Sequence, residues 1–441
     1  MIKKTSLLNS VLFLALSAFN TSQAIADETK TNAILLHAAR VFDGNELKTN
    51  TSVLISDGKV TKIDARESFN DIEAKVIDLG DATLLPGFIE LHAHLTYKAI
   101  PAKTVLKHGV TTLRDLGGIV HQPYGGKGNL RVLTSGKIIT AVNGYPIPNM
   151  GAENIAIPVD TAEQARETVR KLINEGAVII KIALETGGEQ GAPWSSAHHG
   201  HHKATNNPHA AHDSKPNPHH PAKDEKVAHH KTDNPHHSEH KPATHHATEQ
   251  AAWPLLSEEI VKAIVDEAHK HQRKVTAHIG EQQGAEIAVN AGVDEWAHIP
   301  CAKVSDDVLQ KAVAQKIKII GTFDTLSKCS GIAHNAQTLA KLGAEFLYGS
   351  EIAHPDIPWG IDAQELMYMV QLANMQPLEV LRAATSKAGE QLAIPLLGTL
   401  QAEAPADIIA VKGNPLHALK TLEYPDLVIS GGKVVVNNFE D

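Results

Sequence analysis

The stretch LLPGFIELHAHL, residues 84–95, decides the fold of this chain because it joins an apolar run to two closely spaced histidines. The segment FIELHAH over 88–94 predicts a β-strand. Alternate side chains of a strand share one face, so His92 and His94 point the same way. Two imidazoles on one face form half of a zinc site. The pair alone is weak evidence, and two polar residues at a strand end are the alternative interpretation.

Seven further apolar runs follow, and helical patterns such as TAEQARETVRKLINEG and SEEIVKAIVDEAHKHQ separate most of them, with Ser257 as a helix start. The eight expected strands cover 88–94, 110–115, 131–136, 178–183, 274–279, 293–298, 317–323 and 345–350. This alternation predicts the α/β class, with a (β/α)8 TIM barrel over 87–390. The alternative, an open doubly wound sheet, usually has a glycine-rich first turn, which is absent here.

Both ends of the chain have a different, β-rich character. Short apolar runs such as SVLISDGKVTKI and ADIIAVKG alternate with turn signals, of which Asp57-Gly58 is one. We therefore expect residues 27–86 and 391–441 to form together one small domain, a β-sandwich.

The N-terminus predicts export. Lys3 and Lys4 precede the apolar run LLNSVLFLALSAF, and Ala24-Ile25-Ala26 is a small-x-small cleavage pattern. These features describe a signal peptide over 1–26 and a periplasmic protein that leaves the membrane after processing. An uncleaved anchor is the alternative. The formal net charge of −9 argues against a nucleic-acid partner.

Residues 198–246 hold fifteen of the 27 histidines and six prolines. A stretch with so few apolar residues cannot offset its ordering entropy, so we expect a disordered insertion after the fourth barrel strand. It could collect extra zinc, or be a low-complexity loop with incidental affinity. The two cysteines, Cys301 and Cys329, could pair in an oxidising compartment, but we expect two unpaired core thiols.

Four more residues at the ends of expected strands join the two histidines: Lys181, His278, His298 and Glu351. A lysine inside the run VIIKIA is costly to bury as a cation, which favours a neutral, reactive amine. Each residue alone has a structural alternative, namely a salt-bridged lysine, a core histidine or a solvated glutamate. Together they indicate a metal centre at the mouth of the barrel.

These residues and motifs resemble the metal-dependent amidohydrolase superfamily. LLPGFIELHAHL matches its entry motif, and GVTTLRDLG, the spacing of Lys181, His278 and His298, and the closing APADIIAVKGNPL fit as well. The resemblance covers about 33–437 except the insertion. Within the superfamily it resembles the imidazolonepropionase-like and Xaa-Pro dipeptidase-like branch, which has a lysine on the fourth strand.

The resemblance implies two Zn²⁺ ions, although Mn, Fe or Co can share such ligands. His92, His94 and Glu351 would hold one ion and His278 and His298 the other. Lys181, carbamylated by CO2, would bridge them. A metal-activated water would attack the substrate carbonyl, and Glu351 would carry its proton to the leaving group.

One residue departs from the family pattern. The family normally has aspartate at the end of strand eight, where this chain has Glu351, one methylene longer. We expect Glu351 to do the work, with Asp356 as a substitute or a poorly hydrolysing site as the alternatives. Tyr145 and His121 are the expected substrate contacts, and Tyr124 lies near the latter.

The sequence thus predicts a secreted zinc amidohydrolase that cleaves an amide C–N bond in a dipeptide or cyclic amide. A lactonase or ester-type hydrolase on the same site is one rival function. A catalytically weak periplasmic zinc-binding protein is another. A homo-oligomer stays an open alternative. Arg114 is expected to pair with a carboxylate below the site.

Overall fold

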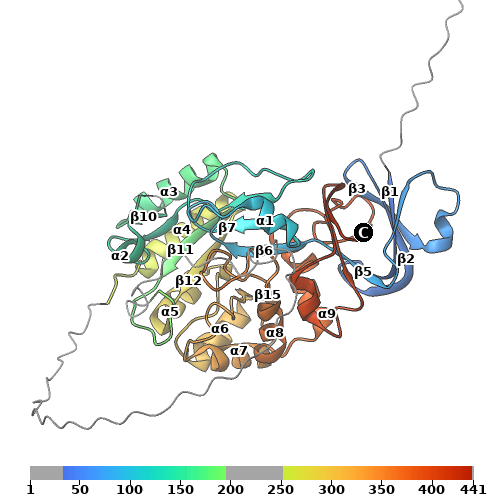
Figure 1. Cartoon of the computed structure of the whole chain (residues 1–441). Coiled ribbons are helices and arrows are strands. Elements are labelled where there is room, and N and C mark those ends of the chain that lie inside the picture. Colours follow the sequence, from blue (N-terminus) through green and yellow to red (C-terminus); the bar gives the residue numbers. More distant parts are fainter. Residues whose placement is uncertain (1–32, 154, 195–251, 440–441) are drawn as a thin grey trace, which may run out of the picture.

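The computed structural model describes residues 33–153, 155–194 and 252–439. The predicted signal peptide and the histidine-rich insertion 198–246 therefore lie outside the described residues. The described chain has a larger part, built of parallel strands and helices, and a smaller strand-rich part (Figure 1).

The smaller part is one mixed sheet that combines both ends of the chain, in the order β18-β17-β16-β5-β1-β2-β3, with β4 beside β1. Asp57 and Gly58 both have positive φ, at 52° and 79°, as the tight turn between β2 and β3 requires. Hydrogen bonding joins all eight strands, so the expected sandwich is a single hydrogen-bonded sheet rather than two. The strands are β1 (Ile34–Phe42), β2 (Leu47–Ser56), β3 (Lys59–Ala65), β4 (Lys75–Asp78), β5 (Ala82–Pro86), β16 (Ile408–Lys412), β17 (Leu427–Ser430) and β18 (Lys433–Asn437).

All pairs in the larger part are parallel, in two sheets ordered β6-β7-β8 and β10-β9-β11-β12-β13-β14-β15. The eight expected strands all occur, while β9 and β10 were not expected. The strands are β6 (Phe88–Ala93), β7 (Val110–Asp115), β8 (Arg131–Thr134), β9 (Ile138–Ala141), β10 (Ala156–Val159), β11 (Ile179–Leu184), β12 (Lys274–Ile279), β13 (Glu295–Trp296), β14 (Lys318–Ile320) and β15 (Phe346–Leu347).

Single contacts join the two parallel sheets at both edges. Val178 donates its N–H to Thr134 O at 2.9 Å, next to β8 and β11. At the other edge His94 N donates to Ile352 O at 2.9 Å, beyond the ends of β6 and β15. The strand order is thus the one expected for a barrel, but ladder hydrogen bonds do not close it into one continuous sheet.

Helices follow most of the parallel strands and lie on their outer side (Figure 1). Ser257 Oγ accepts from Ile260 N at 3.3 Å, which confirms the predicted start of α4. None of the described helices is long and apolar enough to cross a membrane. The helices are α1 (Ala102–Lys107), α2 (Ile147–Met150), α3 (Ala162–Glu175), α4 (Glu258–Lys270), α5 (Gln282–Ala291), α6 (Asp306–Ala314), α7 (Ile332–Lys341), α8 (Ala363–Leu372), α9 (Pro377–Ala383) and α10 (Ser386–Gln391), with short 3-10 turns η1 (Arg66–Phe69) and η4 (Leu419–Glu423).

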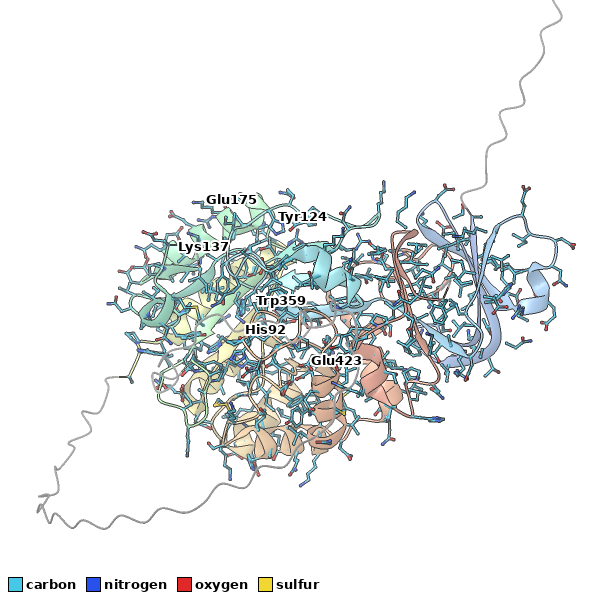
Figure 2. The ribbon with its side chains drawn as sticks, in the orientation of Figure 1. His92, Tyr124, Lys137, Glu175, Trp359 and Glu423 are labelled. Carbon is cyan, nitrogen blue, oxygen red and sulfur yellow. A yellow bond between two sulfur atoms is a disulfide. The ribbon has the colours of Figure 1, made fainter. Side chains whose placement is uncertain are left out.

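The strands that carry the site are buried on both faces. Every residue of β6, β7 and β11 is buried, as expected for parallel strands covered by helices. Polar side chains on these strands therefore lie inside the molecule, and His92 lies near its middle (Figure 2). Such groups need partners or ligands, because unpaired buried polar groups are costly.

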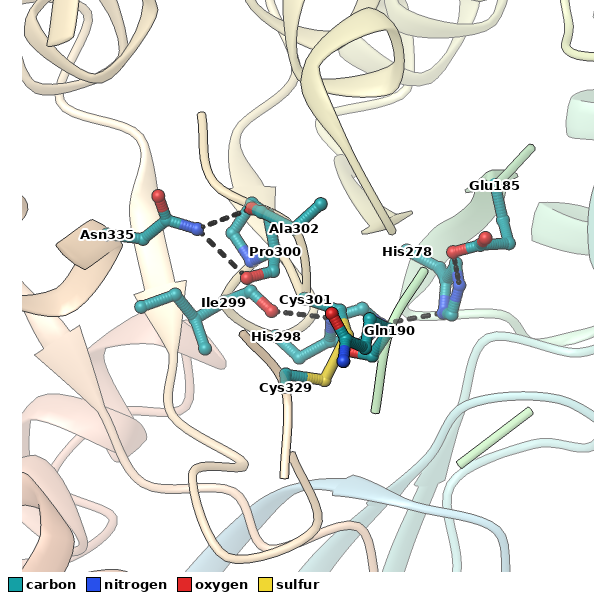
Figure 3. The surroundings of a disulfide bond; sticks show 10 residues. All are labelled: Glu185, Gln190, His278, His298, Ile299, Pro300, Cys301, Ala302, Cys329 and Asn335. Atoms are coloured by element: carbon teal, nitrogen blue, oxygen red, sulfur yellow. Dashed lines mark hydrogen bonds and ion pairs between the residues drawn. A yellow bond between two sulfur atoms is a disulfide. The ribbon is translucent and has the colours of Figure 1, made fainter. Parts of the chain in front are cut away.

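Cys301 and Cys329 form a disulfide, so the expectation of two unpaired thiols is wrong. The loops after β13 and β14 bring their Cα atoms to 4.9 Å, well within the range for a disulfide. Asn335 supports this junction, because its amide donates to Pro300 O and Ala302 O (Figure 3). The bond follows His298 by three residues and therefore ties down the segment that carries it.

Candidate metal centre

The structure brings together the six predicted metal ligands at the C-terminal ends of the parallel strands. The side chains of His92, His94 and Glu351 lie closest, with ligand atoms all within 4.8 Å of one another. His94 Nε2 lies 3.5 Å from Glu351 Oε1. His92 Nδ1 donates to Ala297 O at 2.6 Å, which leaves its Nε2 free to bind a cation.

His278 and His298 form the second part of the centre. The Nε2 atom of His298 lies 2.6 Å from Nδ1 of His278. The other nitrogens of these rings face acceptors, namely Ile299 O at 3.1 Å and a Glu185 carboxyl oxygen at 3.3 Å. If both outer nitrogens donate, the two inner nitrogens direct lone pairs toward each other, an arrangement that a shared cation would stabilise. The His92 and His298 rings stack at 5.8 Å, which joins this pair to the first group.

Lys181 lies on β11, near enough for its charge to act on His92, His278 and His298. Its side chain is 1% exposed, and Nζ has no hydrogen-bond partner among the described residues. Burial lowers the pKa of Lys181 to about 7. A large share of this amine is therefore neutral near neutral pH, as addition of CO2 requires.

Glu351 lies beyond β15 in an unusual backbone conformation. Its φ is +65°, in the left-handed region that a residue with a β-carbon rarely adopts, and this conformation turns the side chain toward His94. Burial opposes ionisation, but the contact with His94 lowers the pKa of Glu351 to about 2. Glu351 Oε2 is buried without a partner among the described residues, so this oxygen is available to a ligand.

Glu90, which no sequence pattern singles out, connects the backbone at His92 with the backbone before Glu351. Its carboxyl group accepts from His92 N at 2.7 Å and from Ser350 N and Oγ at 2.9–3.1 Å. Burial raises the pKa of Glu90 to about 8. Only its position within FIELHAH, two residues before His92, could have drawn attention to it.

Asp115 and Glu185 were missed as well. Asp115, at the end of β7, accepts from Leu95 N at 2.8 Å and from Thr96, and so fixes the chain beyond His94. Glu185 follows β11 directly and contacts His278. Asp115 is the last residue of its strand and Glu185 directly follows its own, and acidic residues at such positions are too common to have been decisive.

An aromatic wall formed by Tyr145, Trp194 and Trp253 covers His278. The Tyr145 ring stacks on His278 with centroids 4.5 Å apart, and the Trp253 ring stacks on the Tyr145 ring at 5.7 Å. Trp194 contacts His278 at 4.6 Å and His298 at 5.5 Å. Tyr145 is thus beside the centre, where a substrate contact was expected.

His121 lies elsewhere. Its ring packs on Tyr124 at 4.8 Å, and its backbone lies against Gly176 at the end of α3. Tyr124 and Glu175 lie at the periphery, well away from His92 (Figure 2). The structure does not bring His121 to the histidine cluster, because the segment after β7 runs outward over α3. Asp356 is exposed in the loop that follows Glu351.

Arg114 pairs with Glu295 inside the sheet, as the sequence reading expected. Both side chains are at most 1% exposed, and Nη1 lies 3.2 Å from Glu295 Oε2. Arg114 Nε also donates to Leu91 O at 2.8 Å, one residue before His92. The pair therefore links β7 and β13 to β6, the strand that carries His92.

The model of the amidohydrolase family matches residues 83–435, which is most of the chain. The chain belongs to the amidohydrolase family. Ochratoxinase of Aspergillus niger is 30% identical over 206 residues, 41% of this chain and 41% of that protein. An uncharacterized protein of Mycobacterium tuberculosis is 26% identical over 200 residues, 41% of this chain and 52% of that protein. The match thus spans only 41–52% of these curated relatives.

Solved structures of amidohydrolases resemble nearly the whole described fold. Ochratoxinase of A. niger has a TM-score of 0.67 at 20% identity and covers 92% of this chain and 96% of its own. A Xaa-Pro dipeptidase with bound methionine has a TM-score of 0.65 at 20% identity, covering 91% and 99%. At this identity the likeness shows only that the fold is shared. The strands that carry the candidate metal centre are part of this shared fold.

Proposed function

We propose that this chain is a secreted, two-zinc amidohydrolase that cleaves an amide C–N bond in a dipeptide or a cyclic amide. The two parallel sheets would close into the expected (β/α)8 barrel. The observation that carries the proposal is the convergence of His92, His94, His278 and His298 around the buried amine of Lys181, in a chain of the amidohydrolase family.

The donor set fits two metal ions. Lys181 Nζ and Glu351 Oε2 are buried without partners among the described residues, and His278 and His298 direct facing nitrogens at one point. His92, His94 and Glu351 would hold one zinc, His278 and His298 the other, with carbamylated Lys181 between them. When bound, such ions supply Lewis acidity that activates water and polarises a carbonyl.

The residues of this chain supply proton transfer and enclosure. Glu351 lies against His94 and its Oε2 atom has no partner among the described residues, so this carboxyl group can accept a proton and pass it to the leaving nitrogen. Glu90 fixes the turn before Glu351 through Ser350. Tyr145 and Trp194 cover the imidazoles and exclude water from that side, which strengthens electrostatic interactions within the centre.

The substrate class rests on two kinds of support. Relatives of the chain include proteins named ochratoxinase and Xaa-Pro dipeptidase. The disulfide Cys301–Cys329 agrees with the signal peptide and an oxidising periplasm. The histidine-rich segment would bind extra zinc, and a homo-oligomer is compatible with the proposal.

The test is metal content and hydrolysis of a substrate panel by the purified mature chain. We expect two tightly held metals per chain beyond those of the histidine-rich segment, and turnover of N-acyl amino acids, dipeptides or lactams. Lys181→Gln is the control: it should lose a tightly held metal and the turnover together. Turnover of lactones alone would assign the ester-type function, and two metals without turnover would favour the zinc-binding protein.

A further inference from the structure

Glu185 is a buried carboxyl group aimed at one of the centre's imidazoles. Its side chain is fully buried, and its Oε2 lies 3.3 Å from His278 Nε2. Its Oε1 accepts from Gly187 N at 2.7 Å. One carboxyl oxygen of Glu185 is therefore held by backbone, and the other faces His278, as Figure 3 shows for the His278 contact.

Gly280 makes the room for this contact. It lies two residues after His278, where a β-carbon would overlap Glu185 Oε2. The backbone of Gly280 does not have a positive φ, so space and not conformation is what the missing side chain provides. The position of the Glu185 carboxyl group thus depends on the absence of a side chain at Gly280.

The contact determines which nitrogen of His278 is available to a metal. A carboxylate accepts a hydrogen bond, so it selects the tautomer of His278 with its proton on Nε2. Nδ1 then keeps its lone pair and faces His298 Nε2, 2.6 Å away. The Nδ1 atom of His298 faces Ile299 O in the same manner.

The charge around Glu185 is unbalanced without a cation. Glu189, which is also buried, lies next to it. Neither carboxyl group forms an ion pair with a lysine or arginine among the described residues that surround them. A dication on His278 would offset this cost, because buried charges need partners.

We propose that Glu185 is a positioning residue that orients His278 so that its Nδ1 atom completes the second metal position with His298. This rests on the two-metal centre of the proposed function. Glu185 touches neither substrate nor reacting atoms, and its effect passes through the imidazole. Gly280 is necessary for this arrangement, because any larger residue at this position would displace the Glu185 carboxyl group.

The experiment compares Glu185→Gln, Glu185→Ala and Gly280→Ala in the full-length chain by zinc competition with a chelator. We expect Glu185→Ala to weaken one of the two tight sites by ~10–100-fold and leave the other unchanged, as for other outer partners of metal-binding histidines. Glu185→Gln keeps an acceptor oxygen and should lose less. The histidine-rich segment is common to all variants and cancels in the comparison.

Glu267→Gln is the matched control. Glu267 is 4% exposed on α4 and pairs with Arg170 and Lys270. Its replacement therefore shows the effect of removing a buried carboxylate that lies outside the candidate metal centre. It should leave zinc affinity unchanged. The double variant of Gly280→Ala with Glu185→Ala should bind zinc no more weakly than Glu185→Ala alone, because both changes remove one contact.

Unchanged zinc affinity in Glu185→Ala would overturn the proposal, and so would equal weakening of both sites. Failure of the proposed function would be seen in the wild-type chain itself, which would then lack two tight zinc sites or hydrolyse no amide. A wild type with two tight sites but no turnover would still allow the positioning role to be measured.

Discussion

The buried pair of Arg114 and Glu295 offers the sharpest test of how the site is supported. Arg114→Met removes the guanidinium group, its contacts with Glu295 and its hydrogen bond to Leu91 O. Removing one partner of such a pair leaves an uncompensated buried charge and costs about 3–5 kcal/mol. We therefore expect the free energy of unfolding to fall by this amount at pH 8.

The loss should depend on pH in a defined direction. Burial alone would raise the pKa of Glu295, but the charge of Arg114 holds it below its ordinary value. In wild type this carboxylate stabilises the fold above the unfolded pKa of about 4.3 and the contribution fades as pH falls through the lower folded pKa. In Arg114→Met burial dominates and the folded pKa rises above about 4.3. The deficit of the variant should shrink as pH falls from 8 toward 5.

The assay is urea unfolding of both proteins at pH 8 and pH 5.5, followed by circular dichroism. Arg114→Met combined with Glu295→Met should recover much of the loss, because no charge is left buried. Arg166→Met is the matched control, since Arg166 is 36% exposed and pairs with Glu163 on the surface, so it should cost under about 1 kcal/mol. A single variant within 1 kcal/mol of wild type, or a double variant as unstable as the single, would refute the reasoning.

Three further outcomes are expected. Glu351→Asp shortens the side chain that reaches His94, so kcat/KM should fall ~100-fold, and a gain instead would mean that the native site is compromised. Replacing Cys301 and Cys329 by serine opens a loop closed over 28 residues, which should lower stability by about 3.6 kcal/mol in thermal unfolding under non-reducing conditions; an unchanged melting temperature would speak against the bond. Bicarbonate should promote zinc reconstitution of the apoprotein more at pH 8 than at pH 6, because the pKa of Lys181 is about 7 and carbamylation needs the neutral amine. Lys181→Gln should abolish the response to bicarbonate, and a response that persists would exclude Lys181 as the carbamylated residue.

The strands that carry the site could be predicted from the sequence because each is an apolar run ending in a polar residue. His92 and His278 therefore lie next to the last residues of β6 and β12, whereas Lys181 lies in the middle of the apolar run that forms β11. The strands β9 and β10 were not predicted. The ladder beside β11 that stabilises β9 comes from segments distant in the sequence.

The supporting contacts could not be predicted for a related reason. Glu90 and Glu185 act through partners 260 and 93 residues away, and no local pattern distinguishes them from other acids. The disulfide depends on the approach of two loops, which spacing does not report. His121 shows the converse error, because a histidine after a strand end can turn outward when the chain beyond it packs on a helix.

The aromatic wall also marks where the chain tolerates an insertion. Trp194 and Trp253 stand on either side of the histidine-rich segment, and both contact the ring of Tyr145. The two described residues that flank the segment in the sequence therefore lie near each other. Each doubling of the length of a flexible loop adds only about 0.6 kcal/mol to the cost of closing it. We therefore expect that this segment can be lengthened, shortened or exchanged with little effect on the fold that carries the candidate metal centre.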